Sequence, residues 1–293
     1  MVCGVRCDGA AYDGFWQQLR ELGRVDGRNL VTDIRGADGQ YDRLPALLSD
    51  VLAARPDLVV AAGPQPVRAA KDATATLPIV MMFVADPVLI GLVPSLTRPG
   101  GNLTGVTTLP AGDFLGKQLE LLKEMVPGGS RVGVLWNSTN EIHRAMVPRI
   151  PASAQRLDLR LQLIDVRTPA DIEPAFDTAA RERAQALLVV GDPLFHRPAG
   201  RLPELALRAG LPAIYLDTSV VAAGGLMAYA PDYVALARRA AVQADRILKG
   251  ARPGEIPIEQ PATFSLAINL KTAKALGLTV PPRLLLQATE TFE

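Results

Sequence analysis

The chain has 293 residues, enough for two domains of roughly 150 residues each. Hydrophobic residues make up 48% of the chain and aromatic residues 5%, so the core must be aliphatic and a disordered chain is excluded. The formal net charge is +1, and no basic stripe is present that could neutralise a phosphate backbone. We therefore expect no nucleic acid as a main partner.

The first residues give no sign of export, of a metal site or of a disulfide. The start, MVCGVRCDGAAYDGF, has no cationic segment followed by an apolar run, so no signal peptide is predicted. Cys3 and Cys7 would be about 13 Å apart in a strand, too far for a disulfide, although a helix could just bring them together. We interpret them as two unpaired thiols. His143 and His196 have no ligand-like neighbours at metal spacing, so we expect neither a metal nor a cofactor.

Apolar runs alternate with amphipathic stretches along the chain. In chain order, we predict strands over residues 29–35, 57–62, 78–85, 131–136, 160–166, 185–190 and 212–216, and helices over residues 12–22, 41–54, 66–73, 112–125, 141–156, 169–183, 198–209 and 233–248. Continuous aliphatic runs such as LVVAA and ALLVV are typical of strands buried on both faces of a parallel sheet. The alternation predicts βαβ units with right-handed crossovers.

The strand–helix series runs twice, which predicts an α/β fold of two doubly wound lobes with mainly parallel sheets. Three crossovers would join the lobes, at residues 100–109, 226–231 and 256–264. The N-lobe would comprise residues 1–107 plus 232–262, and the C-lobe residues 108–231 plus 263–293. The long helix 233–248 is predicted to stop at Lys249 and Gly250, a cation in the last turn followed by glycine.

Enzyme signatures are missing, whereas a polar turn follows most of the predicted strands. The sequence contains no G-x-G-x-x-G, no G-x-x-x-x-G-K-[ST] and no G-x-S-x-G, so nucleotide binding and serine hydrolysis lack their usual support. The polar turns are AAGPQP at 61–66, VADPV at 84–88, WNSTN at 136–140, VGDPL at 190–194 and YLDTS at 215–219. Ligands of open α/β sheets bind beyond the carboxyl ends of the strands, so we expect the ligand here.

Every residue of these turns also has a structural interpretation. Asp86 and Asp192 each precede a proline, as an N-cap residue does before a proline at N1. Asn137 could hold its own turn through a side-chain hydrogen bond. Packing and stacking on a ligand ring are both open for the aromatic residues nearby, which are Trp136, Phe195, Tyr215 and Tyr229.

At these turns the chain resembles a known family, the ABC-transporter substrate-binding proteins of the tryptophan- and tyrosine-binding lipoprotein type. The resemblance covers nearly the whole chain and includes FWQQLREL from Phe15, RPGGNLTGVT from Arg98 and INLKTAKALGLTVPP from Ile268. It implies a type I periplasmic-binding fold whose two lobes close over a small organic solute, such as an amino acid or an aromatic compound. The implied ligand contacts, by matching segments, are Gly63, Pro64, Gln65, Asp86, Asn137, Asp192 and Asp217, to which we add Tyr215 and Tyr229.

The resemblance also implies an ABC permease as partner, a periplasmic or lipid-anchored location, and no catalysis; we expect a monomer. Two features depart from the family. The turn at Gly63 reads GPQ where relatives often carry a hydroxyl residue before proline, and Cys3 lacks the apolar segment of a lipid-anchoring motif. Since only a few residues precede the first helix, we interpret the start as misplaced rather than the first strand as lost, because an unpaired strand edge would be costly.

Two other classes of function stay open. One is a ligand-sensing core without a DNA-binding domain. The other is an enzyme that uses Asp86 and Asp192 as acid–base groups, which we disfavour because no His, Cys or Lys stands beside these turns. For the binding protein, we expect Asp192 to project from its lobe and to pair with a ligand ammonium.

Overall fold

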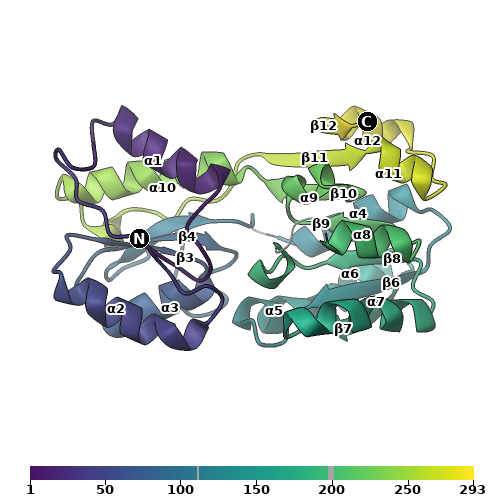
Figure 1. Cartoon of the computed structure of the whole chain (residues 1–293), viewed down its shortest axis with the longest axis horizontal. Helices are drawn as coiled ribbons and strands as arrows, with labels where there is room; N and C mark the ends of the chain where they lie inside the picture. Colours follow the sequence, from purple (N-terminus) through teal and green to yellow (C-terminus); the bar gives the residue numbers. More distant parts are fainter. Residues whose placement is uncertain (111, 197–200) are drawn as a thin grey trace. The chain divides into compact units, whose positions relative to one another are not determined.

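The computed structural model describes residues 1–110, 112–196 and 201–293. The chain forms two compact units: unit 1 is Met1–Pro110 with Asp232–Ala262, and unit 2 is Ala111–Pro231 with Thr263–Glu293. The chain therefore passes between the units three times. Each unit contains one sheet flanked by helices (Figure 1). The predicted fold class, two doubly wound and mainly parallel sheets, is confirmed.

The sheet of unit 1 is parallel throughout, in the order β2-β1-β3-β4-β5. Its strands are β1 (Val2–Cys3), β2 (Arg35–Gly36), β3 (Val59–Ala62), β4 (Ile79–Val84) and β5 (Leu103–Thr107). The apolar runs VVAA and IVMMFV form β3 and β4, and nearly all of their side chains are buried. This is the pattern expected of central strands that are covered on both faces.

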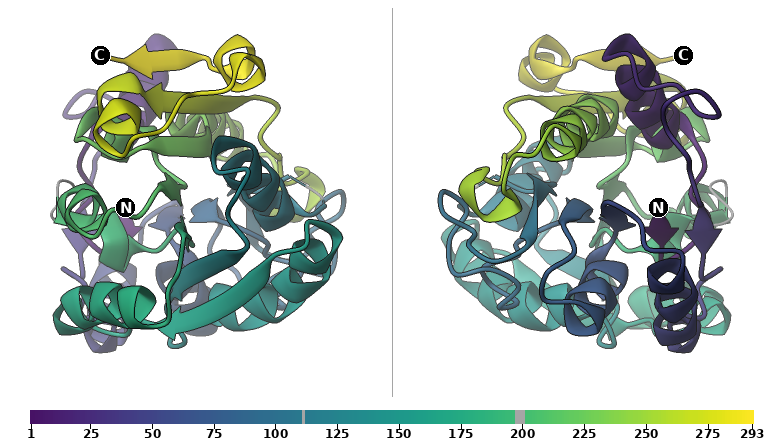
Figure 2. Two further views of the ribbon diagram at one scale, coloured as in Figure 1. Left: turned by 90° about the vertical axis from the view of Figure 1, so that its right-hand side faces the viewer. Right: turned by 90° about the vertical axis from the view of Figure 1, so that its left-hand side faces the viewer.

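Two helices cover each face of this sheet. Helices α1 (Ala10–Glu21) and α10 (Tyr233–Leu248) lie side by side over one face, and α2 (Leu44–Ala53) and α3 (Pro64–Ala73) pack together over the other (Figures 1 and 2). Phe15 of α1 and Leu236 of α10 are buried in one apolar cluster with Met82 of β4. Helix α10 ends as predicted, since Gly250 adopts a φ of 97° and its N–H donates to the Ile247 carbonyl.

The sheet of unit 2 has seven strands in the order β12-β11-β10-β9-β8-β6-β7. They are β6 (Arg131–Trp136), β7 (Arg160–Asp165), β8 (Ala186–Val189), β9 (Ala213–Tyr215), β10 (Met227–Pro231), β11 (Phe264–Asn269) and β12 (Glu290–Phe292). Only the β10–β11 pair is antiparallel among the strand pairs that the structure describes.

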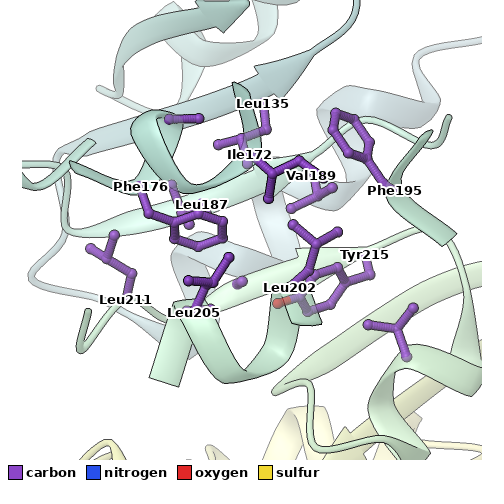
Figure 3. Close-up of a cluster of buried hydrophobic side chains, with 14 of the residues drawn as sticks. Leu135, Ile172, Phe176, Leu187, Val189, Phe195, Leu202, Leu205, Leu211 and Tyr215 are labelled. Atoms are coloured by element: carbon purple, nitrogen blue, oxygen red, sulfur yellow. The ribbon is translucent and has the colours of Figure 1, made fainter. Parts of the chain in front are cut away.

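The helices of unit 2 enclose an aliphatic core. They are α4 (Phe114–Met125), α5 (Glu141–Met146), α6 (Ile150–Arg156), α7 (Ile172–Arg181), α8 (Arg201–Arg208), α9 (Thr218–Ala222), α11 (Leu270–Ala275) and α12 (Pro282–Gln287). Phe176 of α7 and Leu205 of α8 point into one cluster with Leu187 of β8 (Figure 3). Ile172, Ala175, Phe176 and Ala179 are the buried residues of α7, the spacing of one helix face.

Three aromatic rings of unit 2, two pairs of them stacked and one tilted, lie close in sequence to the three chain passages. Phe114 follows the first passage, Tyr229 precedes the second and Phe264 follows the third. The ring centroids are 5.4 Å apart for Phe114–Tyr229, 5.4 Å for Phe114–Phe264 and 5.3 Å for Tyr229–Phe264. Each passage thus contributes one ring to a single cluster, which we call the aromatic stack.

Several predicted elements need correction. Of the predicted strand 29–35, Arg35 joins the sheet as the first residue of β2, whereas residues 29–34 form no strand. Leu30 makes only an isolated bridge to Asp26, and Val31 is 94% exposed, so these residues bury too little. The predicted helix 141–156 divides into α5, a 3₁₀ turn (Val147–Arg149) and α6, because Pro148 and Pro151 each supply no N–H within a helix. The start of the predicted helix 198–209 lies outside the described residues.

The interpretation of Cys3 and Cys7 as unpaired thiols is wrong. The two residues form a disulfide, with Cα atoms 5.6 Å apart. The strand spacing does not apply, because β1 ends at Cys3 and the chain bends over Gly4–Cys7 before α1. The disulfide therefore closes the loop that connects β1 to α1, at the carboxyl edge of the sheet.

We predict that this disulfide stabilises the protein. Closing so short a loop removes chain entropy worth about 2 kcal/mol from the unfolded state. The variant with Cys3→Ser and Cys7→Ser together should lose about this amount in urea unfolding, and the wild-type protein, denatured without reductant, should show no titratable thiol. Two thiols per chain, with unchanged unfolding on reduction, would contradict the pairing.

Candidate functional site

Two of the predicted turns of unit 1 lie next to each other at the carboxyl edge of its sheet. β3 and β4 are neighbours, with Ala62 paired to Met82, so the turns that follow them share one edge. Gly63 adopts a φ of 99° and precedes α3, and its N–H donates to the Met82 carbonyl. Pro64 occupies the first turn of α3, and Gln65 is partly exposed beside it. The positive φ explains the glycine, since other residues rarely adopt it.

Asp86 does not cap a helix, since a turn and no helix follows it, but its side chain holds that turn. Its Oδ1 accepts hydrogen bonds from the backbone N–H groups of Val88 at 3.1 Å and Leu89 at 2.9 Å. Helix α3 holds the segment that follows, because Arg68 donates to the Ile90 carbonyl and Lys71 to the Leu92 carbonyl. The turn after β4 is therefore fixed on both sides, and a ligand role for Asp86 stays a prediction.

In unit 2 the structure brings Asn137 and Asp192 together in a buried polar network. β6 and β8 are neighbours, and these residues follow their carboxyl ends. Asp192 is only 3% exposed, and its Oδ2 accepts from Asn137 Nδ2 at 3.3 Å and from Asn140 Nδ2 at 2.8 Å. Its Oδ1 accepts from the Leu194 N–H at 2.8 Å, which caps the following 3₁₀ turn. The carboxylate is thus both a cap and the centre of a network.

His143, which sequence reasoning missed, completes this network. The Asn137 N–H donates to His143 Nδ1 at 3.0 Å, so Nε2 carries the proton and donates to the Gly191 carbonyl at 2.9 Å. Nε2 lies 3.9 Å from Asp192 Oδ2. Burial lowers the pKa of His143, against the opposing charge of Asp192, so the neutral ring is favoured. The expectation that no histidine stands beside these turns is therefore wrong; the spacing Asn140-x-x-His143 in the first turn of α5 was the available signal.

The other predicted site residues of unit 2 have mainly structural contacts. Asp217 caps α9, accepting from the Ser219 N–H at 2.8 Å. Tyr215 and Phe195 are 2% and 5% exposed and lie in the core cluster (Figure 3), and burial raises the pKa of Tyr215. Tyr229 is partly exposed within the aromatic stack.

Trp136 and Tyr215 each have one buried polar atom, the indole Nε1 and the hydroxyl, without a hydrogen-bond partner in the described residues, but Trp136 is the one of the two that is partly exposed. Trp136 is the last residue of β6 and directly precedes Asn137. Buried donors normally have a partner, so the unpaired indole N–H at this edge of the sheet is consistent with an acceptor atom that a bound ligand would supply.

Residues 1–110, 112–196 and 201–293 contain neither a candidate metal site nor a candidate membrane span. These residues contain no group of three or more His, Cys, Asp or Glu side chains that could hold a metal ion. None of their helices combines the length and the apolar character that crossing a membrane requires.

Two doubly wound units, with polar turns gathered at the carboxyl edges of their sheets, are the arrangement found in solute-binding proteins of the periplasmic type. The chain belongs to the ABC transporter substrate binding protein family, whose model matches residues 7–292. A tyrosine-binding protein from Clostridioides difficile (strain R20291) is 28% identical over 268 residues, which are 92% of this chain and 76% of that protein.

Solved structures agree with this assignment. A conserved domain protein from Vibrio cholerae superposes with a TM-score of 0.92 at 26% identity, covering 99% of this chain and 98% of the other. The ABC domain from Streptococcus pneumonia in complex with L-Trp gives a TM-score of 0.92 at 25% identity, with the same coverage. The family is one of proteins that bind small solutes, and the expected family resemblance is confirmed.

We predict that His143 makes unit 2 sensitive to mild acid. Its pKa is below the ordinary value of 6.5 in the folded protein, so the unfolded chain binds the extra proton first as pH falls. The free energy of unfolding should therefore fall below about pH 6.5, by at most about 1.4 kcal/mol per pH unit. Urea midpoints at pH 7.5 and 5.5, read from Trp136 fluorescence with Trp16→Phe as background, measure this. His143→Gln should flatten the dependence, and equal slopes would contradict it.

Proposed function

We propose that this chain is the substrate-binding component of an ABC importer and that its ligand is an aromatic amino acid. One observation carries the proposal: the family model spans residues 7–292, and relatives that align over more than nine-tenths of the chain are a tyrosine-binding protein and a domain in complex with L-Trp. The ligand would contact the polar turns of both units, which correspond to the predicted N-lobe and C-lobe. Binding would favour a closed form through its higher affinity for the ligand.

The Asp192 network supports a ligand that carries an ammonium group. Within the described residues, the hydrogen-bond donors to this buried carboxylate are the neutral amides of Asn137 and Asn140 and the Leu194 N–H. Burial lowers the pKa of the nearby His143 and favours its neutral form, and both of its ring nitrogens are engaged in hydrogen bonds. A buried negative charge is costly without a cation, and an α-ammonium of a bound amino acid would supply one.

The same contacts argue against an enzyme. A general acid or base must reach the proton it transfers, but His143 is 1% exposed and both of its ring nitrogens are engaged. The Oδ1 atom of Asp86 accepts from two backbone N–H groups, so this residue holds its own turn. We therefore propose binding without catalysis.

The Cys3–Cys7 disulfide supports a location outside the cytoplasm, because disulfides persist in oxidising compartments. We propose a periplasmic or lipid-anchored monomer that delivers its solute to an ABC permease, as members of this family would. Nucleic acid is not expected as a partner, given the net charge of +1.

We predict that L-tyrosine, L-tryptophan or both raise the melting temperature of the purified chain. A ligand present at 100 times its dissociation constant should add about 2.7 kcal/mol to the free energy of unfolding. Differential scanning fluorimetry over the twenty amino acids, followed by isothermal titration calorimetry, identifies the ligand. No shift with any aromatic amino acid would contradict the proposal.

We predict that Asp192→Asn weakens amino-acid binding far more than it weakens the fold. Asparagine can still cap the turn but cannot pair a charge, so binding should lose about 2–5 kcal/mol. The sharpest comparison is between L-tyrosine and 3-(4-hydroxyphenyl)propionate, which lacks the ammonium: the wild-type protein should prefer L-tyrosine strongly and Asp192→Asn should not. Asp171→Asn is the matched control, because Asp171 caps a helical turn in the same unit. An unchanged preference in Asp192→Asn would remove this residue from the site.

A further inference from the structure

Phe83, the penultimate residue of β4, has an unusual backbone conformation. Its φ is 59°, in the left-handed region that bulky residues rarely adopt. The pairing of β4 with β5 is irregular at this point, between Met81 and Val84. Such a conformation persists only where the surrounding structure enforces it, and it is often found at functional sites.

The neighbouring strands hold Phe83 in this conformation. On either side of it, the Met82 carbonyl accepts from the Gly63 N–H at 2.9 Å and the Val84 carbonyl from the Thr108 N–H at 3.0 Å. Gly105 of β5 permits the close approach, since a Cβ there would lie 2.1 Å from the Met81 carbonyl oxygen. The conformation is therefore built into the sheet.

The positive φ of Phe83 changes the direction in which its aromatic ring points. Side chains alternate along a regular strand, so Phe83 would face away from the side that Met82 faces. Instead both residues pack against the apolar cluster that α1 and α10 contribute to. The Phe83 ring meets Tyr12 edge-on with centroids 5.5 Å apart, and Tyr233 with centroids 5.7 Å apart.

The three rings lie at the edge of the sheet where the predicted ligand turns lie. Phe83 is three residues before Asp86. It is on β4, the neighbour of β3, and Gly63 directly follows β3. Tyr12 is in the first turn of α1, and Tyr233 is the first residue of α10. All three side chains are partly exposed, unlike the fully buried Met82 below them.

We propose that Phe83, held edge-on by Tyr12 and Tyr233, is the residue of unit 1 that selects ligands with an aromatic side chain. This inference rests on the proposed function and adds the basis of its specificity. Two aromatic rings in edge-to-face or offset contact are stabilised beyond what the area that they bury accounts for, a gain that an aliphatic group of similar size lacks. Burial, and then the charge of Asp8, raise the pKa of Tyr12 to about 12, so the cluster stays uncharged at neutral pH and suits a neutral ring.

Calorimetry with L-phenylalanine, L-tyrosine and L-cyclohexylalanine tests the proposal. Cyclohexylalanine has the size of phenylalanine without the aromatic ring, so the wild-type protein should prefer phenylalanine over it. Phe83→Leu should lose affinity for phenylalanine and tyrosine by about two- to tenfold, the effect of one lost aromatic pair. Its affinity for cyclohexylalanine should stay nearly constant.

Two further variants make the result decisive. Phe83→Gly removes the ring and suits the positive φ, so it should fold even if Phe83→Leu does not, and it should lose the same preference. Trp16→Leu is the matched control: Trp16 is on α1 one turn beyond Tyr12, packs edge-on against Phe15 at 5.1 Å, and should leave ligand preference unchanged. Melting curves of each variant without ligand check folding.

The outcomes separate the two proposals. If the wild-type protein binds aromatic amino acids and a folded Phe83 variant keeps the preference for phenylalanine, the role of Phe83 is overturned while the proposed function stands. If the wild-type protein binds no aromatic amino acid, both are overturned.

Discussion

Parallel strand pairing determines where the turns that carry the candidate site lie in each unit. A parallel pair requires a crossover connection, usually a helix, so every strand of a parallel sheet points the same way and every connecting turn leaves from the same edge. The five strands of unit 1 obey this rule throughout, and most pairs of unit 2 do as well. Gly63 and Asp86 are thereby brought to one edge, and Asn137 and Asp192 to another, although each pair is far apart along the chain.

The sequence predicted the elements that bury most apolar surface. The run IVMMFV predicted β4 and ALLVV predicted β8 within a residue or two, and the stop at Lys249 and Gly250 predicted the end of α10 to the residue. The prediction failed where burial is slight or the element is short. β1 has two residues and β12 has three, too few to show a period, and residues 29–34 include strand-forming residues that remain exposed or partly exposed.

In the candidate site, the sequence could predict only those hydrogen bonds that join residues close together along the chain. The side-chain contacts of Asp86 and Asp217 span two or three residues, so the sequence could suggest them. The Asp192 network joins residues about fifty positions apart and depends on the β6–β8 pairing, which the sequence does not state. The Phe83 conformation depends on Gly105 in the next strand and gave no signal of its own.

The aromatic stack has a mechanical consequence. Phe114, Tyr229 and Phe264 are each within a few residues of one chain passage, and their rings are in mutual contact. Chain passages without a shared contact could each rotate independently. Here the ring beside each passage packs against the other two rings, so rotating one passage would displace the rings of the others. Moving any one of these rings therefore disturbs the packing of the other two, so the unit 2 ends of the three passages are coupled through one cluster.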